Sequence, residues 1–78
     1  MNNKERILVD IGKFDKIINE IKENNFNEKE KEVIESAMNY RSDCVYYLEK
    51  GEDFTSLDCI AYGHGLLDAL RIIHDLIE

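Results

Sequence analysis

The chain has 78 residues, of which 17 are acidic and 10 are basic, so its formal net charge is −7 at pH 7. A chain this short forms one small domain, and its acidity, without any basic block, argues against nucleic acid phosphates and anionic membranes as partners. The absence of proline and the presence of only four glycines argue against a turn-rich β-sandwich or barrel. We expect a single all-α domain over residues 1–78, located in the cytoplasm.

A first helix is predicted over about residues 3–24. Its apolar residues recur in steps of four and three, which is the period of an apolar stripe on one helix face. These residues are Ile7, Ile11, Phe14, Ile18 and Ile21. The helix is expected to stop between Asn24 and Asn27, since asparagine tolerates the left-handed backbone of a C-terminal cap.

A second helix is predicted over about residues 28–50. Asn27 is a suitable N-cap, and Glu30, three residues later, completes a variant of the capping box. Gly51 suits the left-handed position that follows a helix C-terminus. The apolar side chains form a wide stripe, which favours a helix packed between two neighbours. They are Val33, Ile34, Ala37, Met38, Cys44, Val45 and Leu48.

A third helix is predicted over about residues 54–77. Either Asp53 or Thr55 can cap its start, and Asp58 completes a Thr-x-x-Asp capping box with Thr55. Its seam again repeats in steps of four and three: Cys59, Gly63, Leu66, Leu70, Ile73 and Ile77.

Three helices of matched length with short connections predict an antiparallel, up-down-up bundle. If the turn between the second and third helices is centred near Glu52, residues whose numbers sum to about 104 lie level with one another. Cys44 is then expected beside Ile60.

Two glycines, Gly63 and Gly65, lie inside the predicted third helix. Each costs about 1 kcal/mol of helix stability relative to alanine. The sequence therefore indicates either a close approach of a neighbouring helix or a kink. By the same register, Arg41 lies level with Gly63 and His64, where the glycines would leave room for it.

Four polar side chains interrupt the apolar seams and form a candidate cluster. They are Arg41, His64, Asp68 and Arg71, with Tyr40 and Tyr62 expected to line it. One interpretation is a pocket in which the arginines bind an anion, the histidine acts as acid or base and the aspartate orients it. The other is a structural network that satisfies half-buried polar groups and fixes the helix register. The spacing alone leaves both interpretations open.

No metal, cofactor or catalytic site is predicted. His64 and His74 are ten residues apart, about 15 Å along one helix, so a single ion cannot bind both within one chain. His64 and Asp68 together provide only two ligands, which do not close a site. Cys44 and Cys59 lack the flanking residues of a catalytic cysteine, and they are expected to be small buried side chains without a disulfide.

Two segments carry a resemblance to a known family. Residues 46–51 read Tyr-Tyr-Leu-Glu-Lys-Gly, and residues 59–69 read Cys-Ile-Ala-Tyr-Gly-His-Gly-Leu-Leu-Asp-Ala. The chain resembles domain of unknown function family 357, whose small, mostly archaeal helical members show a Tyr-Ala-His-Gly-Trp-Leu-Asp-Ala run after a Leu-Glu-Lys-Gly turn. The matching residues are Tyr62, His64, Gly65, Leu67, Asp68 and Ala69, while Gly63 and Leu66 replace the usual alanine and tryptophan.

This resemblance covers about half of the chain, residues 40–73. It implies a short antiparallel helical bundle, an archaeal source, a cytoplasmic location and no assigned activity. It also places His64 and Asp68 of the candidate cluster inside the matching motif.

From the residues we favour a non-enzymatic protein-interaction or oligomerisation module. A chain of this size gains little net stability on its own, so a partner would help to stabilise it. Tyrosine is typical of half-buried interfaces, and the expected interface residues are Tyr40, Tyr46 and Tyr47. The expected partner is a second copy or another protein, without nucleic acid or membrane. The alternative is a site at the candidate cluster that binds or processes a small anionic ligand.

Overall fold

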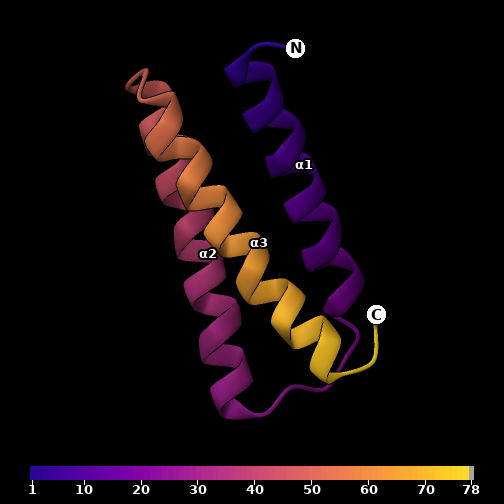
Figure 1. Cartoon of the computed structure of the whole chain (residues 1–78). Coiled ribbons are helices and arrows are strands. Elements are labelled where there is room, and N and C mark those ends of the chain that lie inside the picture. The colour runs from indigo at the N-terminus through magenta and orange to yellow at the C-terminus, as the bar shows by residue number, and fades with distance from the viewer. Residues whose placement is uncertain (78) are drawn as a thin grey trace.

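Three α-helices make up the computed structural model, which describes residues 1–77. They are α1 (Asn3–Ile21), α2 (Glu28–Glu49) and α3 (Asp53–Ile73), and consecutive helices run in opposite directions (Figure 1). The predicted all-α, three-helix fold with short loops is confirmed. Each helix begins within one residue of its predicted start. No helix in the described part of the chain is long and apolar enough to cross a membrane.

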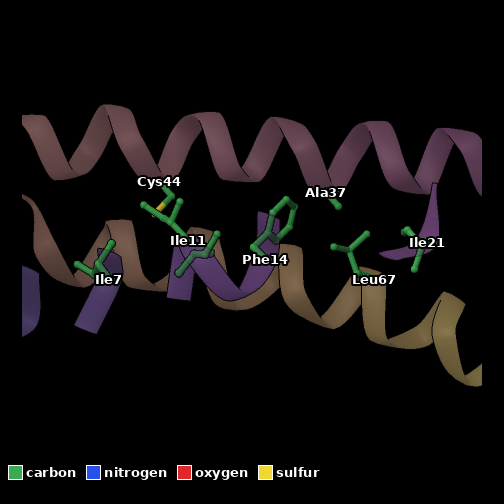
Figure 2. Close-up of a cluster of buried hydrophobic side chains, with 8 residues drawn as sticks. Ile7, Ile11, Phe14, Ile21, Ala37, Cys44 and Leu67 are labelled. Atoms are coloured by element: carbon green, nitrogen blue, oxygen red, sulfur yellow. The ribbon is translucent and has the colours of Figure 1, made fainter. Parts of the chain in front are cut away.

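The α2–α3 hairpin is the most closely packed pair, and α1 packs mainly against α3. The core between them contains side chains from all three helices: Ile7, Ile11, Phe14, Ile21, Ala37, Cys44, Ile60 and Leu67. Figure 2 shows Phe14 of α1 beside Ala37 of α2. Because α1 and α2 each pack mainly against α3, α3 is the central helix of the bundle. The prediction that the second helix lies between two neighbours is therefore wrong.

Close packing explains one of the two glycines of α3. A Cβ atom added at Gly63 would lie 3.1 Å from Cε2 of Phe14 and 3.2 Å from the carbonyl oxygen of Ala37. The predicted close approach of a neighbouring helix is therefore confirmed at Gly63. A Cβ added at Gly65 would meet nothing within 4 Å, so packing within the chain does not require a glycine there.

The register of the α2–α3 hairpin is close to the predicted one. Pairs that touch across the hairpin have residue numbers that sum to between 100 and 104: Ala37 and Gly63, Tyr40 and Tyr62, Cys44 and Ser56, and Glu30 and His74. Cys44 thus lies level with Ser56, one helical turn before the predicted Ile60. Ser56 is fully buried, and its hydroxyl donates a 2.7 Å hydrogen bond to the Cys44 carbonyl, while Sγ of Cys44 lies 3.3 Å from that hydroxyl.

The starts of α1 and α2 have side-chain caps. Oδ1 of Asn2 accepts a 2.8 Å hydrogen bond from the backbone N–H of Glu5. At α2, Asn27 accepts from the N–H of Glu30, and the Glu30 carboxylate accepts from the N–H of Asn27. The predicted capping box at residues 27–30 is confirmed, and it satisfies two backbone donors that the helix leaves free.

The predicted cap of α3 is wrong. The helix already begins at Asp53, so Glu52 is its N-cap and makes no side-chain hydrogen bond to the first turn. Gly51 explains this early start. It adopts the left-handed conformation (φ 77°), and the N–H groups of Gly51 and Glu52 close back onto Leu48 and Tyr47. This Schellman turn ends α2 and leads directly into α3, which leaves no room for a separate cap at Thr55.

The ends of α1 and α3 fall earlier than predicted. α1 ends at Ile21 and not near Asn24, and no asparagine adopts the predicted left-handed conformation, since Asp75 is the one non-glycine residue with positive φ in residues 1–77. α3 ends at Ile73 and not at residue 77. Asp75 (φ 57°) reverses the chain there, and the N–H of Leu76 returns to the carbonyl of Arg71 at 2.8 Å.

Candidate functional site

Arg41 of the predicted polar cluster binds a carboxylate of α1. Its Nε and Nη2 atoms donate hydrogen bonds of 2.6 and 2.8 Å to the two carboxylate oxygens of Asp15. This bidentate bond, partly opposed by burial, holds the pKa of Asp15 below its ordinary value and raises that of Arg41. Arg41 therefore connects α2 to α1 and does not face the glycines of α3.

His64 makes a different contact, also with α1. Its Nε2 atom donates a 3.0 Å hydrogen bond to the backbone carbonyl of Asp10, and its ring meets the ring of Phe14 edge to face at 5.6 Å. The side chain is half-buried. This geometry holds α3 against α1 and occupies one ring nitrogen of His64 within the chain.

Asp68 and Arg71 pair with each other on α3. Nη1 of Arg71 donates a 3.0 Å hydrogen bond to Oδ1 of Asp68. The structure thus separates the predicted cluster into three contacts: Arg41 with Asp15, His64 with the Asp10 carbonyl, and Asp68 with Arg71. Residues 1–77 contain no group of three or more side chains placed to bind a metal ion. The role of these residues in binding an anion stays a prediction.

A second histidine forms a contact that the sequence reasoning missed. Nε2 of His74, at the C-terminal end of α3, lies 2.6 Å from Oε2 of Glu30 in the first turn of α2, and Phe26 packs edge-on against the imidazole at 4.8 Å. The hydrogen bond from the Asn27 backbone, together with the His74 contact, lowers the pKa of Glu30. The predicted register of the α2–α3 hairpin could have indicated this contact, because the residue numbers 30 and 74 sum to 104.

The two thiols are free within the described residues, and neither has the environment of a reactive cysteine. Burial raises the pKa of Cys44 in spite of its contact with Ser56. Burial also raises the pKa of Cys59, with a further contribution from Asp43 and Asp58. A raised pKa keeps a thiol protonated and poorly nucleophilic near neutral pH.

The tyrosines occupy two separate positions. Tyr40 and Tyr62 stack across the α2–α3 hairpin with ring centroids 4.6 Å apart. Tyr46 is half exposed, and it packs perpendicular to Tyr47 at 5.2 Å with Nζ of Lys50 5.4 Å from its ring centroid. A shallow, open hollow beside Tyr40 is lined by polar side chains of α2: Ser36, Asn39 and Asp43. The predicted interface role of these tyrosines is a proposal that contacts within one chain do not address.

The solvent-facing side of α3 differs from those of its neighbours. Its exposed residues, which we call the outer face of α3, are Phe54, Thr55, Asp58, Ala61, Tyr62, Gly65, Ala69, Ile72 and Ile73. Among these nine residues, Asp58 alone is charged. Phe54 is 79% exposed, Ile73 68%, Tyr62 59% and Ile72 54%. The exposed positions of α1 and α2 are, by contrast, mostly charged or otherwise polar.

A helix that is apolar on all sides is normally buried on all sides. α3 approaches this composition, because apolar side chains lie both in its core face and on its outer face, with Asp68 and Arg71 on a side between them. α1 and α2 cover only part of this apolar surface. Contiguous exposed apolar surface of this kind is typical of a protein contact site. The fold and this surface together define a small three-helix protein with an uncovered apolar face on its central helix.

The comparisons with known proteins agree with this class. A family model described as "Protein of unknown function (DUF357)" matches residues 10–76. The chain therefore belongs to this family, as the motif in α3 suggested, and the match extends beyond that motif into α1. The comparison with curated proteins finds no match.

Proposed function

We propose that this chain is a non-enzymatic protein-interaction module that binds its partner through the outer face of α3. The observation that carries the proposal is the exposure of Phe54, Tyr62, Ile72 and Ile73 on one side of the central helix. Burying these side chains against a partner removes apolar surface from water, which is the main favourable term in protein association.

The chemistry of the remaining polar groups supports a binding role over catalysis. Arg41 and Arg71 are each bound to a carboxylate of the chain, and one ring nitrogen of each histidine has a partner within the chain. An anionic-ligand site would need these arginines to give up their carboxylates. We therefore do not propose the alternative function.

Site-specific photo-crosslinking tests the proposal. A photo-reactive phenylalanine analogue replaces Phe54 in the full chain, inside the cells that naturally make the protein. The matched control carries the analogue at Leu8, which is 59% exposed but lies on α1. We expect irradiation to give one discrete covalent adduct from position 54 and none from position 8.

The mass of the adduct identifies the class of partner. An adduct of twice the 9.1 kDa chain indicates a second copy, and any other discrete mass indicates a different protein. The absence of an adduct from position 54, or equal adducts from both positions, contradicts the proposal. Circular dichroism of both purified variants checks that the three helices are retained.

A further inference from the structure

We infer that the partner of the outer face of α3 is a second copy of the chain, with the two α3 helices packed antiparallel about a two-fold axis near Gly65. This inference rests on the proposed function, because it names the occupant of the same surface. In such a pair, Gly65 of one copy faces Gly65 of the other, and Ala61 lies level with Ala69 across the axis. A two-fold interface of this kind uses the same patch on both copies.

The available area is sufficient for a dimer. A large aromatic side chain contributes roughly 150–250 Å² of surface, and Phe54, Tyr62, Ile72 and Ile73 are each more than half exposed. With the small residues between them, the outer face offers roughly 600 Å² per copy, which is the lower end of a specific interface of about 1,200 Å² in total. Interfaces at this lower end are typical of weak, transient association, so we expect binding in the micromolar range.

The distribution of charge favours a second copy at this face. Each chain carries a net charge of −7, so two copies repel wherever their acidic surfaces meet. The outer face of α3 contains a single acid, Asp58, and no base. Antiparallel pairing centred on Gly65 places the two Asp58 residues 14 positions apart along the helices, which is about 21 Å. That separation exceeds the Debye length of about 8 Å at physiological salt.

The small residues allow the two helices to approach closely. Ala61, Gly65 and Ala69 are spaced four residues apart and therefore lie along one side of α3. The space beyond Gly65 is open to 4 Å, so the surface is low at its centre and flanked by the larger Tyr62 and Ile72. A second helix can enter this depression, and each glycine then contacts the backbone of the other copy.

Analytical ultracentrifugation of the full chain tests the inference. We expect a reversible monomer–dimer equilibrium with a dissociation constant of about 10 µM. Gly65→Glu places two like charges at the axis and is expected to weaken the dimer at least 100-fold. Gly12→Glu is the matched control, because Gly12 is also an exposed glycine inside a helix with nothing within 4 Å of an added Cβ. The control should dimerise like the unchanged chain.

A charge pair tests the antiparallel register. Ala61→Lys and Ala69→Glu are each expected to weaken the dimer about tenfold, whereas the double variant should recover the original affinity. Residues 61 and 69 are eight positions apart, about 12 Å along one helix, so the two charges cannot pair within a chain. Recovery of affinity in the double variant supports the antiparallel register. A double variant whose loss of affinity equals the sum of the two single losses overturns it.

Two results would overturn the second copy as the occupant. One is a chain that stays monomeric up to about 500 µM, well above the expected dissociation constant. The other is a dimer that Gly65→Glu leaves unchanged, since it would form through another surface. If the chain is monomeric in solution but gives a photo-adduct of a different mass, the proposed interaction module stands and only the second copy as its partner is ruled out. The absence of any adduct at Phe54 removes both.

Discussion

Two glycines of α3, Gly63 and Gly65, are expected to respond in opposite ways to replacement by alanine: one substitution should lower the free energy of unfolding and the other should raise it. In a helix interior, alanine is more favourable than glycine by about 1 kcal/mol. Gly65→Ala receives this gain without opposition, since an added Cβ meets nothing within 4 Å. Gly63→Ala receives the same gain but also creates two close contacts in the core.

The size of the effect at Gly63 follows from what the new Cβ meets. One contact, at 3.2 Å, is the backbone carbonyl of Ala37, and the other, at 3.1 Å, is the ring of Phe14. Neither neighbour can easily move, because Ala37 lies in the middle of α2 and the Phe14 side chain is fully buried. Overpacking of a core costs about 1–3 kcal/mol. We therefore expect a net loss of about 1 kcal/mol for Gly63→Ala and a gain of up to about 1 kcal/mol for Gly65→Ala.

Urea unfolding followed by circular dichroism at 222 nm measures both variants. A difference of about 2 kcal/mol between them corresponds to a difference of about 1–2 M in the urea midpoint for a chain of this size. Protein concentration is held equal and near 1 µM, because dimer formation by the folded state adds to apparent stability. A Gly63→Ala variant as stable as Gly65→Ala would refute the close approach of α2 and α3 at this point.

Further predictions concern single contacts. Removing Arg41 or Asp15 should cost about 0.5–1 kcal/mol because the pair is partly exposed. Because the pKa of Asp15 is lower in the folded chain than its ordinary value of 3.8, the ion pair stabilises the fold above pH 3.8 and loses this effect as the pH falls through the lowered pKa. Unfolding curves of the parent and of Asp15→Asn at pH 7 and pH 3 measure this change in the free energy of unfolding. Asp75→Gly should raise the unfolding free energy by about 0.5–1 kcal/mol, because glycine adopts the left-handed backbone at lower cost. An unchanged or lower urea midpoint would contradict this prediction. In thiol titration at pH 8, Cys59 should react slowly and Cys44 only after unfolding; rapid reaction of Cys44 in the folded chain contradicts its burial.

Most of the fold could be predicted from local patterns. The period of four and three residues locates the buried face of α1, and the capping box at Asn27 and the glycine at residue 51 locate two boundaries. The predicted seam of α3 is partly wrong, because it includes Ile73, which is 68% exposed, and omits Ile60 and Leu67, which are fully buried. The missed end of α3 depends on a single backbone conformation. Asp75 adopts a left-handed conformation that aspartate rarely takes, and it ends α3 within a segment whose apolar seam continues to Ile77.

The candidate site was harder to predict, because residues that lie level on neighbouring helices do not necessarily face each other. Arg41 was expected beside Gly63, yet it follows Tyr40 by one residue and is therefore rotated by about 100° around α2 relative to Tyr40. Tyr40 consequently faces Tyr62 on α3, while Arg41 faces Asp15 on α1. The orientation of α1 decides this contact, and a register for the α2–α3 hairpin alone contains no information about it.

The motif that carries the family resemblance is divided by helix geometry between two faces of α3. Leu67 is fully buried, and His64 contacts α1, so these residues help to form the core and to position α1. Gly65 and Ala69 are exposed, and packing within the chain gives no reason for a glycine at residue 65. Measurements should therefore separate substitutions on the two faces. Substitutions on the core face lower the free energy of unfolding, whereas substitutions on the outer face alter association and leave the free energy of unfolding equal or higher. A motif that serves both the bundle and a contact surface explains why α3 is apolar on its outer face as well as toward the core, although α1 and α2 cover only the core face.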